Sequence, residues 1–273
     1  MLPPFVDPSW LREHRDDVVL ADVRLYLDGR SGREAFEDGH LPGAVFVDPA
    51  TVLSGPPSDE DGRHPLPDPA AFAAGLSAAG IGEHATVVAY DDAGGVMAAR
   101  LVWMLRAVGR PAALLDGGLA AWDEPLEQGS SEPSPALAGV RPWPPELLAT
   151  IDDAVDRAHV VLDARPPDRY AGALDDLDPR AGHIPGARNV PARGNVGPDG
   201  RLLPTDALRE RFAAAGVTDA AAVVSTCGSG VTACHTLLAL EHAGLGRGRL
   251  WPGSWSAYSR DPSRPVAVGT EPG

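Results

Sequence analysis

The hexapeptide Gly39–Ala44 (GHLPGA) returns almost unchanged as Gly182–Ala187 (GHIPGA), 143 residues further along the chain. Three more pairs of similar segments follow the same order at offsets of 136 to 141 residues: Leu20–Arg24 with Leu162–Arg165, Thr86–Asp91 with Ala222–Cys227, and Leu114–Trp122 with Leu250–Tyr258. Offsets close to half of the 273 residues are typical of a duplicated domain. We therefore predict two domains, 1–128 and 147–273, joined by a linker over 129–146 that is rich in proline and serine.

Short apolar runs alternate with helical patterns in both halves. The predicted strands are Val18–Asp22, Thr86–Tyr90, Val160–Asp163 and Ala222–Thr226, and the clearest predicted helices are Asp68–Ala79, Val96–Val108, Thr205–Ala215 and Val231–His242. This alternation predicts an α/β fold in which each domain has a mainly parallel sheet with helices on both faces. In such folds ligands bind beyond the carboxyl ends of the strands.

The chain is acidic, with 38 Asp and Glu residues against 23 basic residues, all of which are arginine. Its hydrophobic content of 44% is typical of a globular protein rather than a disordered one. The net charge of −15 disfavours nucleic-acid and membrane partners, so an anionic substrate needs a local cluster of arginines. We see no secretory signal at the N-terminus and no apolar run long enough to cross a bilayer, so we expect a cytoplasmic protein in a reducing compartment.

The segment Val223–Ala233 (VVSTCGSGVTA) reads as a buried strand, a tight loop and the start of a helix. Cys227 stands at the end of the strand, and the loop that follows contains Gly228, Ser229, Gly230, Val231 and Thr232. The glycines let several backbone N–H groups point at one atom, and the helix dipole adds positive potential. Such surroundings stabilise a thiolate or a persulfide, and the loop hydroxyls are further donors. The alternative is a glycine-rich turn around a structural cysteine.

Two other kinds of loop chemistry are excluded by single residues. Cysteine phosphatases need an arginine six residues after the cysteine to clamp the phosphoryl oxygens, and Ala233 stands there. A nucleotide-binding P-loop needs a lysine near its end, and the chain contains none. Chemistry on a sulfur atom needs neither residue.

The loop Cys227–Ala233 resembles the active loop of 3-mercaptopyruvate sulfurtransferases, one branch of the tandem rhodanese family. Thiosulfate sulfurtransferases, the sister branch, usually carry Arg and Lys in this loop. The resemblance covers nearly the whole chain and includes both hexapeptides, Pro252–Trp255 and Pro265–Pro272. It implies two rhodanese-like domains and no metal or cofactor. It also implies that Cys227 takes sulfur from the donor as a persulfide, pyruvate leaving as an enolate, and passes it to a thiol or to cyanide.

The same resemblance implies that Arg169 and Arg180 bind the carboxylate of a small anionic sulfur donor. An arginine fork suits a carboxylate, but each residue is also a candidate for a surface ion pair with a neighbouring aspartate. The Asp-x-Arg sequence occurs in both halves, and that duplication favours a structural ion pair.

The family resemblance further implies that Ser229 and His64 assist proton transfer. A histidine in a loop is also commonly a solvated or capping residue. The aspartate of the family's relay has no match, because Ala50 stands in its place and Asp48 lies two residues earlier. His40 and His183, which are duplicated within turns, are expected to be structural.

Asp91 in the first half stands where Cys227 stands in the second. A carboxylate cannot store sulfane sulfur, so we expect the first domain to be catalytically silent. Asp91 and Asp92 without further ligands indicate a solvated turn rather than a metal site. Cys234 has apolar neighbours, which favours a buried core thiol over a resolving cysteine that pairs with Cys227.

Two alternatives to transfer from 3-mercaptopyruvate remain open. The donor could be thiosulfate, or the chain could be a non-catalytic persulfide carrier that keeps Cys227 and does not need the arginines. In each case we expect the acceptor to be a thioredoxin-like protein or a low-molecular-weight thiol.

Overall fold

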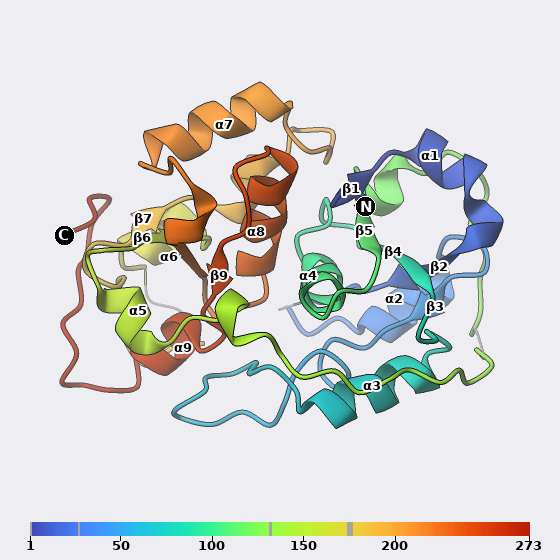
Figure 1. The fold of residues 1–273 in the computed structure, drawn as a ribbon, viewed down its shortest axis with the longest axis horizontal. Coiled ribbons are helices and arrows are strands. Elements are labelled where there is room, and N and C mark those ends of the chain that lie inside the picture. Colours follow the sequence, from blue (N-terminus) through green and yellow to red (C-terminus); the bar gives the residue numbers. More distant parts are fainter. Residues whose placement is uncertain (1, 27, 131–132, 174–176) are drawn as a thin grey trace. The chain divides into compact units, whose positions relative to one another are not determined.

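The computed structural model describes residues 2–26, 28–130, 133–173 and 177–273. The chain divides into two compact units, each built around its own parallel sheet (Figure 1). The first unit comprises Met1–Gly55, Leu66–Trp143 and Val196–Leu202, and the second comprises Pro56–Pro65, Pro144–Asn195 and Leu203–Gly273. Both units have the α/β architecture that the repeat predicts.

The first unit has a five-stranded sheet in the order β1-β5-β4-β2-β3, in which all pairings are parallel. Its strands are β1 (Phe5–Val6), β2 (Val18–Asp22), β3 (Val45–Phe46), β4 (Thr86–Tyr90) and β5 (Ala112–Leu115). Its helices are α1 (Pro8–Glu13), α2 (Gly32–Asp38), α3 (Pro69–Ala78) and α4 (Ala99–Ala107). Helix α4 packs on β4 and β5, and its residues from Ala99 to Arg106 are all buried.

The second unit has a four-stranded parallel sheet in the order β7-β6-β8-β9. Its strands are β6 (Val160–Asp163), β7 (Arg188–Asn189), β8 (Val223–Thr226) and β9 (Arg249–Leu250). Its helices are α5 (Ile151–Val155), α6 (Pro167–Ala171), α7 (Thr205–Ala214), α8 (Ala233–His242) and α9 (Ser254–Tyr258). This order repeats β3-β2-β4-β5 of the first unit, so the duplication extends to the topology of the sheets.

The duplicated sequence motifs tie each sheet to the turn that follows. The guanidinium of Arg24 makes two hydrogen bonds with Asp22 and donates a third, of 2.8 Å, to the carbonyl of Gly39 at the start of the first hexapeptide. The buried pair of Asp163 and Arg165 does the same in the second unit, where it reaches Gly182 at 2.8 Å. The predicted structural ion pair is therefore present in both halves.

The hexapeptide histidines are buried in the same way in both units. His40 stacks on Phe36 with ring centroids 3.8 Å apart, and its Nδ1 lies 2.7 Å from the carbonyl oxygen of the same residue. His183 stacks on Tyr170 at 3.7 Å, with Nδ1 2.9 Å from that residue's carbonyl oxygen. Both histidines thus fix a turn against an aromatic ring, as their duplication predicts.

Two short segments pack with the unit formed mainly by the other half of the chain, and the boundaries 1–128 and 147–273 stay a prediction. Residues 56–65 belong to the second unit, where the backbone N–H of Arg63 donates to Ser256 Oγ at 3.0 Å. Residues 196–202 belong to the first unit, where the N–H of Leu202 donates to Asp116 at 2.6 Å. Hydrogen bonds between segments far apart in sequence therefore hold each of these loops in its unit. Such long-range bonds cannot be predicted from the local periodicity of a sequence.

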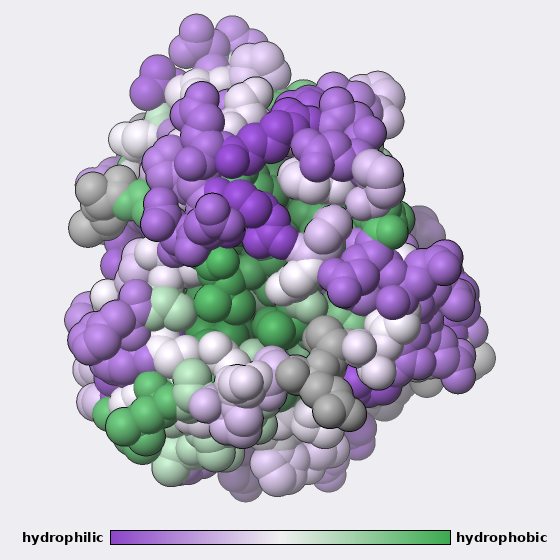
Figure 2. Space-filling view, turned by 90° about the vertical axis from the view of Figure 1, so that its right-hand side faces the viewer, coloured by the Kyte–Doolittle hydropathy of each residue, from purple (hydrophilic) through white to green (hydrophobic). Residues whose placement is uncertain are grey.

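Each unit has its own hydrophobic core. That of the first unit includes Leu11, Leu20, Phe36 and Tyr90, and that of the second includes Trp251, Trp255 and Tyr258. On the face drawn in Figure 2, hydrophilic residues cover most of the outer surface and the hydrophobic ones are mostly recessed. None of the helices in the described part of the chain has the length and apolar character that crossing a bilayer requires.

Candidate active site

Cys227 follows the last residue of β8 and opens the loop that leads into α8. Its side chain is buried, and it is a free thiol. Three hydrogen bonds join this loop to the start of α9: the N–H of Cys227 donates to Ser254 Oγ at 3.1 Å, and the carbonyls of Cys227 and Gly228 accept from the N–H groups of Trp255 and Ser256 at 3.0 and 2.8 Å. Helix α9 therefore fixes the backbone on which the nucleophile stands.

The remaining predicted loop residues lie where the sequence places them. Gly230 has a φ of +75°, a left-handed conformation that glycine adopts without strain. Val231 is buried and Thr232 precedes the first residue of α8. Cys234 is fully buried on α8, where its Sγ lies 3.4 Å from the carbonyl oxygen of Gly230. This environment is that of the core thiol predicted for Cys234.

The equivalent loop of the first unit shows what this backbone geometry can bind. The carboxylate of Asp91 accepts four backbone hydrogen bonds of 2.7 to 2.8 Å, from the N–H groups of Ala93, Gly95, Met97 and Ala98. Burial raises the pKa of the Asp91 carboxyl, although these N–H donors oppose the shift. Asp91 is therefore a buried carboxyl group with four backbone donors, and not part of the solvated turn that the sequence predicted. A loop of this type directs several backbone N–H donors at one acceptor group at the carboxyl end of its strand.

His64 and Ser229 meet beside the thiol loop. Nδ1 of His64 lies 2.7 Å from Oγ of Ser229, a hydrogen-bonding distance. His64 reaches this position because segment 56–65 folds onto α9, where a side chain at Gly62 would collide with Gly253 and Ser256. The structure thus brings together two of the residues that sequence reasoning assigned to proton transfer.

Arg169 on α6 also lies at the thiol loop. A Cβ atom placed on Gly228 would be 3.8 Å from both terminal nitrogens of Arg169 and 3.3 Å from Nη2 of Arg63. Nη2 of Arg169 donates to Asp178 at 3.3 Å, and Nη1 of Arg63 donates to the other carboxylate oxygen of Asp178. Two arginines and one buried carboxylate therefore stand next to the residue that follows Cys227.

Arg180 is placed differently from the sequence-based expectation. Its guanidinium donates four hydrogen bonds of 2.6 to 3.2 Å to backbone carbonyls, those of Tyr258, Ser259, Asp261 and Arg264. A guanidinium has five N–H groups, so most of its donors hold the chain that follows α9. Arg169 and Arg180 line one small cavity together with Arg165 and Asp178, and their binding of a donor carboxylate stays a prediction.

Arg165 contributes positive charge near the nucleophile. Burial disfavours its charged form, but the charge and hydrogen bonds of Asp163, with further electrostatic contributions from Asp178 and Cys227, outweigh burial and raise the pKa of the Arg165 guanidinium. The same guanidinium lies 4.8 Å from the centre of the Trp255 ring. The duplicated Asp-x-Arg pair therefore has an electrostatic effect at the thiol in addition to its structural role.

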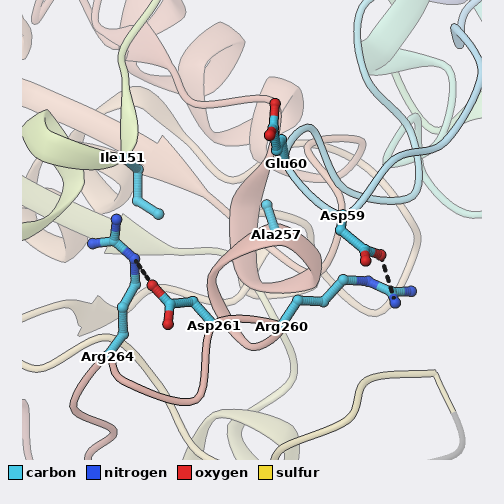
Figure 3. A pocket seen from close by; sticks show the side chains of 7 residues that line it. All are labelled: Asp59, Glu60, Ile151, Ala257, Arg260, Asp261 and Arg264. Atoms are coloured by element: carbon cyan, nitrogen blue, oxygen red, sulfur yellow. Dashed lines mark ion pairs between the residues drawn. The ribbon is translucent and has the colours of Figure 1, made fainter.

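The second unit also has a larger cavity, of about 360 Å³, away from the thiol loop (Figure 3). Two ion pairs occupy its wall: Arg260 with Asp59 at 2.9 Å and Arg264 with Asp261 at 3.3 Å. The side chains that line it include no cysteine, serine or histidine.

Sequence reasoning missed three residues of the site: Arg63, Asp178 and Ser254. Arg63 directly precedes His64, and Asp178 lies two residues before Arg180. Ser254 aligns with Gly118 of the first half, and a glycine at the matched position is a signal of unusual backbone geometry. Asp48 lies in the first unit, where its carboxylate accepts the N–H of Ala50 at 2.9 Å.

Comparison with known proteins agrees with this architecture. The family model of the rhodanese-like domain matches residues 7–125 and 144–261. A Pseudomonas aeruginosa protein, named as a probable 3-mercaptopyruvate sulfurtransferase, is 42% identical over 93% of each chain. A Mycobacterium tuberculosis protein, provisionally named thiosulfate sulfurtransferase SseB, is 40% identical over 93% of this chain and 92% of its own.

A solved structure shares the fold over nearly the full length. The structure of SseA from Escherichia coli, a 3-mercaptopyruvate sulfurtransferase, superposes with a TM-score of 0.80 at 35% sequence identity and covers 93% of this chain and 99% of its own. Both halves match the same domain family, and the sulfur-transfer names recur among the relatives. The chain belongs to the rhodanese family and is a tandem-domain sulfurtransferase, similar to proteins named as 3-mercaptopyruvate and as thiosulfate sulfurtransferases.

Proposed function

We propose that this enzyme moves sulfane sulfur from 3-mercaptopyruvate to a thiol or to cyanide through a persulfide on Cys227. The observation that carries the proposal is the contact of Ser229 with His64 beside the loop of Cys227, at 2.7 Å. The absence of Arg and Lys from the loop, and the names of the relatives, favour this donor.

The proposed reaction has two stages. In the first, the Cys227 thiolate attacks the sulfur of the donor, the carbon–sulfur bond breaks and its electron pair stays on carbon as the pyruvate enolate. The proton of the donor thiol ends on that carbon, which becomes the methyl group of pyruvate. We assign this transfer to Ser229 and His64, which form a hydrogen-bonded pair at the loop.

In the second stage an acceptor removes the outer sulfur of the persulfide. A thiolate acceptor becomes a persulfide itself, and cyanide becomes thiocyanate, while Cys227 returns to its thiolate form. We propose a thioredoxin-like protein or a small thiol as the acceptor, in a reducing compartment such as the cytoplasm. Asp91 cannot take part in this exchange, so the first domain is assigned no sulfur chemistry.

Thiocyanate formation from 3-mercaptopyruvate and cyanide tests the nucleophile. We expect Cys227→Ser to reduce the rate by at least about 1,000-fold, because the attacking atom is lost. Cys234→Ser, a matched change seven residues away, keeps most of the activity because that thiol is buried on α8. An undiminished rate in the Cys227 variant would refute the proposed intermediate.

Thiosulfate is the second candidate donor, since the SseB relative carries that name at 40% identity. The ratio of kcat/KM for the two donors separates the candidates. We expect 3-mercaptopyruvate to be preferred by at least about tenfold, a difference of about 1.4 kcal/mol in transition-state binding. A preference for thiosulfate would assign the chain to the sister activity.

A further inference from the structure

Arg63, the residue before His64, is attached to the rest of the second unit at two points. Its backbone N–H donates to Ser256 Oγ at 3.0 Å. Its guanidinium donates from Nη1 to the carbonyl of Leu177 at 2.8 Å and to the carboxylate of Asp178. A single hydrogen bond fixes where a residue lies but leaves the chain free to pivot about it, whereas attachment at a second point also fixes the direction of the chain. That direction decides where the side chain of His64 can reach.

The backbone attachment belongs to the framework that also holds the nucleophile. Ser256 Oγ accepts from Arg63, and the N–H of Ser256 donates to the carbonyl of Gly228 at 2.8 Å. Gly228 directly follows Cys227. Ser256 on α9 thus links Arg63 to the thiol loop through two hydrogen bonds, and a rotation of the chain about this link changes the distance from His64 to the loop.

The side-chain attachment is shielded from water. The side chain of Asp178 is 4% exposed and that of Arg63 is 22% exposed. A second ion pair of segment 56–65, between Asp59 and Arg260 at 2.9 Å, has side chains that are 81% and 44% exposed. Exposed ion pairs hold a chain weakly because water competes for both partners, whereas the loss of one partner from a buried pair leaves an uncompensated charge. The guanidinium of Arg63 is therefore the stronger of the two side-chain tethers.

Asp178 is itself held in place. Its second carboxylate oxygen accepts from Nη2 of Arg169, a residue of α6, at 3.3 Å. The guanidinium of Arg63 also lies against the thiol loop, since a Cβ atom placed on Gly228 would be 3.3 Å from its Nη2. Arg63 is thus fixed between a buried acceptor and the loop that carries the nucleophile.

We propose that Arg63 is a positioning residue for His64: its guanidinium, held by Asp178, keeps Nδ1 of the imidazole 2.7 Å from Oγ of Ser229. Arg63 acts through His64 and is assigned no contact with the donor. The proposal rests on the proposed function, in which Ser229 and His64 transfer the proton, and it names the residue on which their contact depends. A displacement of about 1 Å in such a pair lowers a rate by up to about 100-fold.

Nuclear magnetic resonance of the His64 ring measures this contact without any sulfur transfer. In protein that contains 15N-labelled histidine, the Nδ1 signal of His64 is identified by its loss in His64→Gln, and Ser229→Ala gives its position when the hydrogen bond is absent. We expect Arg63→Gln to move the signal at least about halfway to that position. Arg63→Lys moves it less, because a lysine retains the charge without the fork.

Asp178→Asn changes the other side of the tether and carries the same test if Arg63→Gln does not fold. The signal moves in the same direction, because a neutral amide is a weaker acceptor for a guanidinium than a carboxylate is. Arg247→Gln is the matched control. It removes an arginine that pairs with Glu241 at 3.7 Å near the C-terminal end of α8, in the same unit, and leaves the signal in place.

Steady-state kinetics give the second readout. With 3-mercaptopyruvate and cyanide, Arg63→Gln lowers kcat about tenfold and changes KM by less than about twofold, because a misplaced His64 affects the chemical step and not the binding of the donor. A tenfold rise in KM with an unmoved His64 signal would instead place Arg63 in donor binding and overturn the proposal.

An unmoved signal in an Arg63→Gln protein whose circular dichroism matches the wild type also overturns the proposal. If the signal moves but the wild type does not turn over 3-mercaptopyruvate, the positioning role stands and the proposed donor is wrong. If the signal moves and kcat does not change, the positioning role stands and the proton transfer assigned to His64 is wrong.

Discussion

Gly118 and Ser254 are matched residues of the two halves, and both have a left-handed backbone, with φ of +56° and +51°. The residue after each donates its N–H to the carbonyl of the matched loop residue: Leu119 to Asp91 at 2.8 Å and Trp255 to Cys227 at 3.0 Å. Glycine adopts this conformation freely, while a serine there costs about 1 kcal/mol. In return, the Ser254 hydroxyl accepts the N–H of the nucleophile itself. We infer that Ser254 is a positioning residue.

Two substitutions at Ser254 separate strain from hydrogen bonding. Ser254→Gly loses the hydroxyl but relieves the backbone, so we expect its free energy of unfolding to change by less than about 1 kcal/mol. Ser254→Ala loses the hydroxyl and keeps the strain, so we expect it to be about 1 kcal/mol less stable than the glycine variant. Urea unfolding measures both values. Equal stability of the two variants would contradict the strain argument.

Ser254 is also expected to affect turnover. The glycine variant, although stable, should form thiocyanate several-fold more slowly, because the Cys227 backbone loses one of the bonds that hold it. A comparison of kcat with thermal stability distinguishes this positioning role from a purely structural one. Unchanged kcat in Ser254→Gly would show that the hydroxyl does not position the nucleophile.

Some residues of the site can be predicted from a short local motif, and others cannot. Cys227, Ser229 and the loop glycines lie within one short motif, so the sequence alone predicts that they are together. Arg63 and Asp178 come from segments more than 100 residues apart that meet only when 56–65 folds onto the second unit. No periodicity or motif in one sequence reports such a pairing.

Among the elements, the central strands were predicted best. The structure places β2, β4 and β6 at the predicted residues and starts β8 one residue later, because apolar runs of four to five residues bounded by polar ones are local signals. The strands β1, β3, β7 and β9 have only two residues each, and their pairing depends on the neighbouring strand rather than on their own pattern. The sequence does not predict strands of this kind.

Helix α4 begins three residues later than its hydrophobic pattern predicts, at Ala99 instead of Val96. The N–H groups of Met97 and Ala98 bind the carboxylate of Asp91, and that of Gly95 does so as well. The backbone before the helix is therefore shaped by hydrogen bonds to the Asp91 carboxyl group rather than by helix propensity. Helix α8 also begins later than predicted, at Ala233 instead of Val231.

Helix α5 has a pH-dependent cap. Asp153 accepts the N–H of Thr150 at 2.7 Å, and Thr150 accepts the N–H of Asp153 in return. These bonds, with the Arg249 guanidinium at 2.9 Å, lower the pKa of Asp153 from 3.8 to about 2. Because the carboxyl binds protons less readily in the folded chain, its stabilisation is complete above about pH 4 and is lost as the pH falls towards 2.

Unfolding of Asp153→Asn checks this sign. At pH 7 we expect the variant to be less stable than the wild type by about 1 kcal/mol, a typical value for a partly exposed cap. The difference should shrink as the pH falls below about 4. Asp152→Asn, at the exposed neighbouring position, is the control and should show a much smaller effect. A difference that does not vary with pH would argue against the cap.

For the whole molecule, Gly62 decides whether segment 56–65 can join the second unit. Its φ is +82°, and a side chain there would meet Ser256 and the backbone of Gly253. We expect Gly62→Ala to lower kcat about tenfold or more, because His64 is drawn away from Ser229. Gly29→Ala is the matched control, since Gly29 has a φ of +88° with nothing within 4 Å of an added Cβ.

The two variants share the cost of a left-handed alanine, about 1 kcal/mol, so only the collision distinguishes them. Thiocyanate assays and thermal unfolding of both proteins give the comparison. If Gly29→Ala loses as much activity as Gly62→Ala, backbone strain alone explains the loss. The position of segment 56–65 would then not determine the rate.

The exchange of segments between the units also affects the order in which contacts can form during translation. Residues 56–65 leave the ribosome early, yet the hydrogen bond from Arg63 to Ser256 Oγ spans 193 residues of sequence. Closing so long a loop is slow and has to wait for the last tenth of the chain. A nascent chain that has not yet reached α9 therefore presents Cys227 before the backbone N–H of Arg63 has its partner at Ser256. We therefore expect segment 56–65 to reach its final place only after α9 has formed.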